Sequence, residues 1–477
     1  MRYEPAIGLE IHVQLSTRTK LFCADTVGFG GEPNSRVCPV CLGLPGALPA
    51  LNQHAVELGV RAALGLQCTV ARSSRFARKN YFYPDLPKGY QITQFDQPLA
   101  SNGRIDLGDD APARTIRIRR VHIEEDAARL IHDRFAGRTA VDLNRAGAPL
   151  IEIVTEPDLR SPAEARALLG ALKQLLQYLD VSDCEMEKGS LRVDANLSVR
   201  PAGATELGTK TEIKNLNSFA SVEHALTVEC ARHIAVLDQG SRVVQQTMLW
   251  DATTRTTRTM RSKEEGSDYR YFPDPDLPPL VLDERFLESV RAQLPELPRA
   301  KRRRLQSQYG IPAYDATLLS ADRATADFFE QVVSHGAAAK AASNWIMTEL
   351  LAWSRGRGQL PAALPFGPAQ LAELIDMVHD RTVSARAAKQ VLAELMRSGG
   401  APRDIVAAQR LRRVDDVVQV TRWAREVIGR YPAETERYRA GERRLLDFFI
   451  GQTLRLSQGT ADPHVVASTL KEVLEDG

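Results

Sequence analysis

The feature that most constrains the fold is a stretch of strict alternation near the start of the chain. Apolar side chains occupy every second position from Ile7 to Leu15, which predicts a half-buried β-strand. Glu10, His12 and Gln14 fill the positions between them and therefore share the other face. The pattern fits either a solvated face of an antiparallel strand or a binding site for a cation or phosphate, and later acidic segments favour the site.

Length and composition set the class of protein. A chain of 477 residues predicts about two to four domains, and no run approaches the ~18 apolar residues that a membrane span needs. The six cysteines are too sparse for a disulfide framework and favour a reduced, cytoplasmic protein. We see no signal peptide in the first residues and expect no membrane. A net charge of +2 does not exclude nucleic acid, because binding depends on where the basic residues lie.

Four residues of a loop rich in glycine and proline have the spacing of a zinc knuckle. Cys38 and Cys41 lie in a Cys-Pro-x-Cys-x-Gly turn, Cys23 supplies a third thiol, and Asp25 is the nearest candidate for a fourth ligand. A carboxylate is a less common partner for three thiolates, so structural zinc and reduced, unligated thiols both remain open.

A second loop combines lysines with aromatic residues. Lys79 and Lys88 flank an aromatic, proline-punctuated stretch that contains Tyr81. Lysine is a mobile point charge for phosphate, and aromatic rings offer faces on which bases stack. The alternative is a solvated loop with packed tyrosines.

Acidic residues recur within apolar strands. Glu124 and Glu125 follow a strand-like run that contains His122, where mutual repulsion requires a cation or a basic partner. Glu152 lies inside a β-branched apolar run, where an unpaired charge would cost several kcal/mol. Its position makes Glu152 the best single candidate for a metal ligand.

Two more alternating stretches follow. Asp194 shares a strand face with its neighbours in 191–199, and Lys210 shares one with two further charged residues in 209–215. The stretch 203–211 approaches a phosphate-binding P-loop, but an extra threonine interrupts it and a strand rather than a helix follows, so we reject that motif.

The composition of the sequence changes after residue 290, where alanine, leucine and arginine recur at helical spacing. We predict an α+β protein: a catalytic cradle domain with a mixed or antiparallel sheet at 1–292, a helical domain at 293–400 and a small helical tail at 401–477. The basic run 301–304 fits a solvated helix face and tRNA contact about equally.

Several long motifs occur together in one order. They are Gly8-Leu-Glu-Ile-His12, the 78–83 loop, His122-Ile-Glu-Glu-Asp126, Asp142-Leu-Asn-Arg145 and the acidic-aromatic stretch 264–275. Over essentially the whole chain, the sequence resembles the B subunits of the tRNA-dependent amidotransferases (GatB). The resemblance implies that ATP phosphorylates the side-chain carboxylate of a mischarged Glu-tRNA(Gln) or Asp-tRNA(Asn), and that ammonia then displaces the phosphate. It also implies a heterotrimer with two partners, a glutaminase (the A subunit) and a small bracing protein (the C subunit).

The resemblance further implies roles for the residues singled out above. The Mg²⁺ ligands would be Glu10, His12, Glu125 and Glu152, with Glu124 close by; a histidine is atypical for Mg²⁺, so His12 could instead orient a bound water. Lys79 and Lys88, with Tyr81 beside them, would meet ATP phosphates or the tRNA end. Asp194 and Lys210 would relay protons. Zinc-bearing relatives carry Cys-x-Cys where this chain has Cys23-Ala-Asp25, which makes Asp25 either a substitute ligand or a sign that zinc is lost.

Two rival functions remain at this stage. An ATP-grasp-like synthetase acting on a free amino acid would not need the long helical tail. A non-catalytic tRNA-binding scaffold would not need carboxylates in apolar strands. The sequence shows no glutaminase signature, so we expect the chain to depend on a partner for ammonia.

Overall fold

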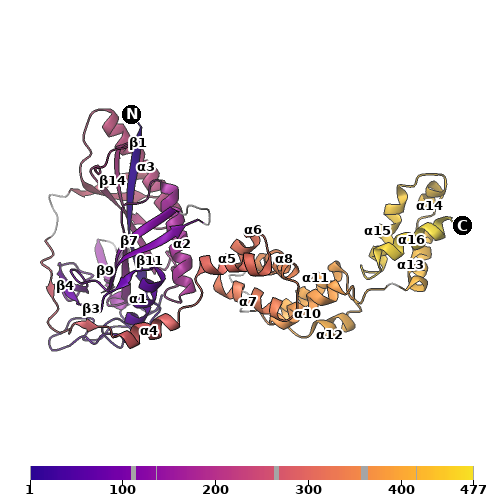
Figure 1. Ribbon diagram of the computed structural model, residues 1–477, viewed down its shortest axis with the longest axis horizontal. Helices are drawn as coiled ribbons and strands as arrows, with labels where there is room; N and C mark the ends of the chain where they lie inside the picture. The colour runs from indigo at the N-terminus through magenta and orange to yellow at the C-terminus, as the bar shows by residue number, and fades with distance from the viewer. Residues whose placement is uncertain are drawn as a thin grey trace. The chain divides into compact units, whose positions relative to one another are not determined.

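A computed structural model describes residues 2–108, 114–135, 137–262, 268–355, 364–414 and 416–475 (Figure 1). The chain divides into two compact units, Met1–Arg299 and Ala300–Gly477. The first four residues of the acidic-aromatic stretch, 264–267, lie outside the described residues.

The first unit is organised around a mixed sheet whose described part has nine strands in the order β14-β13-β12-β11-β1-β10-β7-β6-β2. All neighbours are antiparallel except β12 and β13, which are parallel. The strands are β1 (Tyr3–Gln14), β2 (Thr69–Val70), β6 (Ala100–Leu107), β7 (Arg114–Glu125), β10 (Pro149–Thr155), β11 (Leu191–Pro201), β12 (Thr211–Leu216), β13 (Gln246–Asp251) and β14 (Thr256–Ser262).

Strand β1 lies inside this sheet, as the alternation predicts. Ile7, Leu9 and Ile11 are fully buried, whereas Glu10 and His12 between them are half-buried. The apolar face packs against α1 (Gln53–Gly65), α2 (Pro162–Tyr178) and α3 (Phe219–Asp238), and Figure 1 shows α2 and α3 along one side of the sheet. We call this the helix face and the opposite one the polar face. Each buried leucine or isoleucine on the helix face stabilises the fold by about 1.5–3 kcal/mol.

Local signals explain where the helices begin. Ser161 accepts a hydrogen bond from the backbone N–H of Glu164, and proline occupies the first turn of α2. Ser218 caps α3 in the same way through the N–H of Ser221.

Smaller elements surround the main sheet. They are the three-stranded sheet β15-β4-β5, the pairs β3–β16 and β8–β9, and two short helical segments: β3 (Ser73–Ser74), β4 (Ala77–Asn80), β5 (Tyr90–Thr93), β8 (Arg129–Phe135), β9 (Arg138–Asp142), β15 (Phe272–Pro273), β16 (Leu280–Val281), η1 (Leu143–Arg145) and α4 (Glu284–Ala292).

The rest of the chain is helical in its described part. The helices are α5 (Pro298–Tyr309), α6 (Ala313–Leu319), α7 (Arg323–Ser334), α8 (Ala339–Trp345), η3 (Ile346–Leu350), α9 (Leu351–Arg355), α10 (Pro368–His379), α11 (Ala385–Ser398), α12 (Pro402–Ala408), α13 (Val417–Arg430), α14 (Pro432–Arg439), α15 (Leu445–Leu456) and α16 (Pro463–Glu475). They form one apolar core between Leu305 and Leu411 and another between Val420 and Leu474.

The predicted α+β class with helical segments following the sheet is confirmed. The three-part division at 292 and 400 stays a prediction. None of the described helices combines the length and apolarity that crossing a membrane requires.

Candidate active site

Three strands bring an imidazole–carboxylate cluster together on the polar face. The register places His12 of β1 opposite Glu152 of β10, and Glu152 opposite His122 of β7. Glu124 lies two residues beyond His122 on the same face of β7. His12 Nε2 lies 3.4 Å from Glu124 Oε1 and 3.6 Å from Glu152 Oε2, and His122 Nε2 lies 2.9 Å from Glu152 Oε2.

The cluster offers carboxylate oxygens to a bound cation. Burial disfavours the ionised Glu124 carboxylate, but a hydrogen bond with His122 and the charges of both histidines outweigh burial and hold its pKa well below the usual range. Glu152 is partly buried, and contact with His122 likewise lowers its pKa. One ligand atom each from His12, Glu124 and Glu152 lie within 4.8 Å of one another. The two carboxylates supply the oxygen ligands that a hard cation such as Mg²⁺ takes, and His12 beside them would orient a bound water.

Glu10 lies next to this cluster rather than in it. It is two residues from His12 on the same face of β1, and its carboxylate accepts a 3.0 Å hydrogen bond from Asn196 Nδ2. Burial raises its pKa first, and repulsion from Glu152, Glu212 and Asp194 raises it further. A cation between Glu10 and Glu152 would relieve part of that repulsion.

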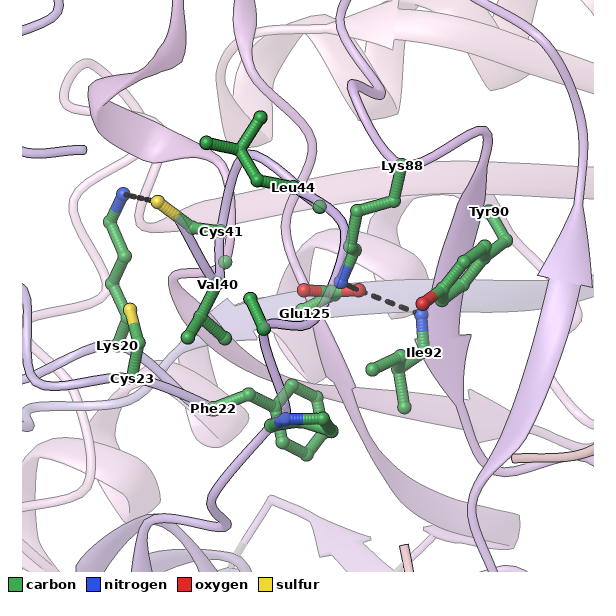
Figure 2. A pocket seen from close by; sticks show the side chains of 14 residues that line it. Lys20, Phe22, Cys23, Val40, Cys41, Leu44, Lys88, Tyr90, Ile92 and Glu125 are labelled. Atoms are coloured by element: carbon green, nitrogen blue, oxygen red, sulfur yellow. Dashed lines mark hydrogen bonds and ion pairs between the residues drawn. The ribbon is translucent and has the colours of Figure 1, made fainter. Parts of the chain in front are cut away.

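Glu125 points elsewhere, which corrects its expected grouping with Glu10 and Glu152. Adjacent residues of a strand face opposite sides, so Glu125 leaves β7 away from Glu124. Its carboxylate forms an ion pair with Lys88 and accepts a 2.9 Å hydrogen bond from the N–H of Ile92. Lys88 and Glu125 meet in Figure 2. Both line a cavity of about 60 Å³ whose lining also includes Cys41. The structure therefore brings Glu124, not Glu125, to His12 and Glu152.

Lys79 and Tyr81 lie near the imidazole–carboxylate cluster, whereas Lys88 does not. The charge of Lys79 is one of those that lower the pKa of Glu124. Burial raises the pKa of Tyr81, and the charges of Asp85 and Glu124 add to the effect. Lys88 is engaged by Glu125 instead.

Sequence reasoning missed three residues around the cluster. His122 was seen beside the acids but given no role, although its spacing from Glu124 places both on one strand face. Tyr269 and Tyr271 come from a distant segment that no local pattern links to the site. Burial, together with the charges of Glu124 and Glu152, raises the pKa of Tyr271 to about 12.

Asp194 and Lys210 lie along the same polar face with separate partners. Lys214 Nζ donates to Asp194 at 2.6 Å, whereas Lys210 Nζ donates to Asn196 Oδ1 at 3.0 Å. Since Asn196 in turn donates to Glu10, Lys210 is connected to the acidic residues through one amide. The two residues predicted as a proton relay thus belong to two different chains of contacts.

The thiol cluster forms as the spacing predicts. One ligand atom each from Cys23, Asp25, Cys38 and Cys41 lie within 4.8 Å of one another. Asp25 Oδ2 lies 3.6 Å from Cys23 Sγ and 3.3 Å from Cys41 Sγ. These separations match the roughly 3.5 Å expected between a sulfur and an oxygen ligand of one tetrahedral zinc ion. The donor set therefore fits zinc, with Asp25 as the fourth ligand.

Comparison with known proteins gives the family. Residues 5–288 match the family model of the GatB/GatE catalytic domain, and residues 327–474 match that of the GatB domain. The chain is 50% identical over 476 residues to the B subunit of the aspartyl/glutamyl-tRNA(Asn/Gln) amidotransferase of Moorella thermoacetica, covering 99% of this chain and 100% of the relative. It is 48% identical to the protein of the same name from Myxococcus xanthus, with 99% of each chain covered. The chain therefore belongs to the family of the aspartyl/glutamyl-tRNA(Asn/Gln) amidotransferase B subunits.

Proposed function

We propose that this chain is the transamidating subunit of an ATP-dependent amidotransferase that acts on mischarged Glu-tRNA(Gln), Asp-tRNA(Asn) or both. The γ-phosphoryl group of ATP passes to the side-chain carboxylate, which gives an acyl phosphate and ADP. Ammonia then forms the C–N bond, the bond from carbon to the phosphate oxygen breaks, and one nitrogen-bound proton leaves. The products are the amide on tRNA, phosphate and ADP.

The convergence of His12, Glu124 and Glu152 on the polar face supports this proposal most directly. These residues, with Glu10 beside them, would hold Mg²⁺, which neutralises negative charge on the transferred phosphoryl group. A scaffold that only binds tRNA does not need two carboxylates and two histidines gathered on one face of a sheet, because burying ionisable groups is costly.

The remaining residues take roles that follow from their surroundings. Lys79 lies within electrostatic reach of Glu124 and would contact the phosphates, with Tyr81 lining the same edge. Asp194 and Lys210 would relay the proton released as the amide forms, each through its own chain of contacts along the polar face. The Lys88–Glu125 pair would order the neighbouring loop instead of binding nucleotide.

We further propose the assembly and its setting. Ammonia would come from a glutaminase, the A subunit, and a small C subunit would complete a cytoplasmic heterotrimer. The segments 293–400 and 401–477 would act as a helical domain and a tail that contacts the tRNA body. Zinc at the Cys23–Cys41 cluster would be structural. In the basic run 301–304, Lys301 and Arg304 are paired with Glu330, so tRNA contact there would have to compete with that pairing.

The test uses the chain assembled with its own glutaminase and small partner, with ammonium supplied in place of glutamine. We expect amide formation on Glu-tRNA(Gln) or Asp-tRNA(Asn), with one ADP released per amide and a requirement for Mg²⁺. Glu152→Gln should abolish both products, whereas Glu185→Gln, which neutralises a solvent-exposed carboxylate paired with Lys173, should not. Bound tRNA without ADP release would favour the scaffold, and amidation of a free amino acid would favour a small-molecule synthetase.

A further inference from the structure

The segment 268–276 is held against β4 by hydrogen bonds and an ion pair, near the imidazole–carboxylate cluster. The N–H of Asn80 donates to the carbonyl of Tyr269 at 3.0 Å, and Asn80 Nδ2 donates to the carbonyl of Arg270 at 2.9 Å. Strand β15 then pairs with β4, and Arg78 Nε donates to the buried Asp274 at 2.8 Å. Backbone, amide and ion-pair contacts thus fix this segment over four consecutive residues of β4.

The backbone of this segment is strained at Arg270, between the two tyrosines. Arg270 has a φ of 44°, in the left-handed region that costs a non-glycine residue about 1–2 kcal/mol. Asn80 Nδ2 donates to the carbonyls of Tyr269 and Arg270, the two peptide groups that flank the Arg270 Cα, and these contacts keep this conformation. Strain of this kind persists only where the surroundings enforce it, and strained residues are concentrated at functional sites.

The tyrosine rings of the segment form an aromatic wall. Tyr269 packs edge-on against Tyr81 with ring centroids 5.9 Å apart, and against Tyr271 at 6.0 Å. Tyr271 stacks on Phe95 at 4.0 Å with the rings nearly parallel, at 4°. Tyr269 therefore lies at the centre of the wall, between Tyr81 and Tyr271, and Tyr271 is itself held by Phe95. These contacts fix the orientation of the Tyr269 ring.

Lys79 lies over the face of that central ring. Its Nζ is 4.9 Å from the Tyr269 centroid and 5.9 Å from the Tyr81 centroid, within the range of a cation–π contact. Among the residues that the structure describes, no carboxylate comes within ion-pair distance of Lys79. Lys79 is nevertheless close enough to Glu124 for its charge to act on that carboxylate.

We propose that Tyr269 is a positioning residue that holds the Lys79 ammonium group at the edge of the imidazole–carboxylate cluster through its ring face. A carboxylate could hold a lysine in place too, but it would neutralise the charge that a transferred phosphoryl group requires. An aromatic face restrains the ammonium group and leaves its full charge available. This inference rests on the proposed function, since it gives Lys79 the phosphate as its target.

The test replaces Tyr269 by phenylalanine and by phenylalanines carrying an increasing number of ring fluorines, in the assembled complex with ammonium as the nitrogen source. Fluorine withdraws electron density from the ring face with little change in size, so cation–π attraction declines stepwise while packing is kept. We expect Tyr269→Phe to retain kcat within about threefold, and the most fluorinated ring to lower kcat by roughly tenfold. KM for the tRNA should stay unchanged.

The same series in a Lys79→Met background separates positioning from packing. If Tyr269 acts through Lys79, fluorination has no further effect once the ammonium group is gone. Equal losses in both backgrounds, or no loss in either, would overturn the proposal. The matched control is Phe272→Leu, which removes a ring of the same segment that lies over Arg78 instead, 5.9 Å from its guanidinium carbon, and should leave kcat unchanged. An inactive wild-type complex would count against the proposed function, whereas an active one that ignores fluorination counts against this inference alone.

Discussion

The two faces of the central sheet treat buried carboxylates differently. On the helix side, Glu125 is paired with Lys88, and Glu229 of α3 contacts Arg232 and accepts hydrogen bonds from Thr211 and Thr257. On the polar face, Glu124 and Glu152 share two histidines, and Glu10 has an amide as its hydrogen-bond partner. Within the described part of the chain, each of the two helix-side acids therefore has its own lysine or arginine, and these three acids of the polar face do not.

This difference separates structural carboxylates from binding carboxylates. A buried acid with its own cation is already neutralised and holds elements together, as Glu229 joins α3 to β12 and β14. Glu124 and Glu152 instead share His122, a group that becomes neutral by losing a proton, so a cation from outside can take its place as the neutralising charge. Substitutions in the two classes should therefore change activity and stability to different extents.

The largest effect should come from the polar face. Glu124→Gln removes one of the two ionised carboxylates beside His12, and we expect it to lower amide formation from supplied ammonium by roughly 100- to 1,000-fold. The melting temperature should fall by much less than for the corresponding change at Glu125, because His122 keeps Glu152 as a partner whereas Lys88 would lose its anion. Amide formation and thermal unfolding are measured on the same preparations of the complex.

Full activity of Glu124→Gln would show that the polar face takes no part in the reaction. Titrating Mg²⁺ sharpens the result, since losing a residue that holds the ion should raise the Mg²⁺ concentration needed for half-maximal rate. The matched surface variant Glu185→Gln should leave that concentration unchanged.

The sequence was informative wherever periodicity decides the structure. Alternation in β1 placed Glu10 and His12 on one face, and the apolar run around Glu152 indicated a charge that needs compensation. Spacing also predicted the thiol cluster, because a Cys-Pro-x-Cys turn brings its own two ligands together.

What periodicity cannot predict is which strands become neighbours. Glu124 and Glu125 are consecutive, so only one of them can face His12, and the choice depends on a register that pairs β1 with β10 and β10 with β7. Tyr269 is 190 positions from Lys79 along the sequence and reaches it only because Asn80 and Arg78 hold the 268–276 segment. No local pattern contains that contact.

The second effect concerns the stability contributed by the helix-side pair. Glu125→Gln leaves Lys88 without its anion in a site where only 9% of the lysine side chain is exposed. Breaking such a pair should lower the free energy of unfolding by about 3 kcal/mol, measured by denaturant titration. The Lys88→Met/Glu125→Gln double variant should recover much of that loss, because no buried charge then lacks a partner. Additive losses would mean that the two side chains act independently.

The third effect is a pH dependence of the free energy of unfolding that Glu229 causes. Burial disfavours the charged carboxylate, but hydrogen bonds from His233 and Arg232 and the charge of Arg232 outweigh burial and lower its pKa to about 2. A lowered folded-state pKa contributes stability above the unfolded value, and this contribution is lost as the pH falls toward 2. Between about pH 6 and pH 3, the wild type should lose about 2 kcal/mol relative to Glu229→Gln. Parallel pH profiles for the two proteins would contradict this assignment.

The smallest effect should come from the thiol cluster, whose soft ligands contrast with the oxygens of the polar face. If zinc binds at Cys23, Asp25, Cys38 and Cys41, Asp25→Cys supplies a fourth thiolate and should tighten zinc binding by roughly tenfold. Asp25→Ala should weaken it, and competition with a colorimetric chelator measures both changes. Glu124→Gln is the control, because a carboxylate of the polar face should not alter zinc affinity. Purified protein without zinc, in which Asp25→Cys also binds none, would leave these four residues as a packed loop with no metal role.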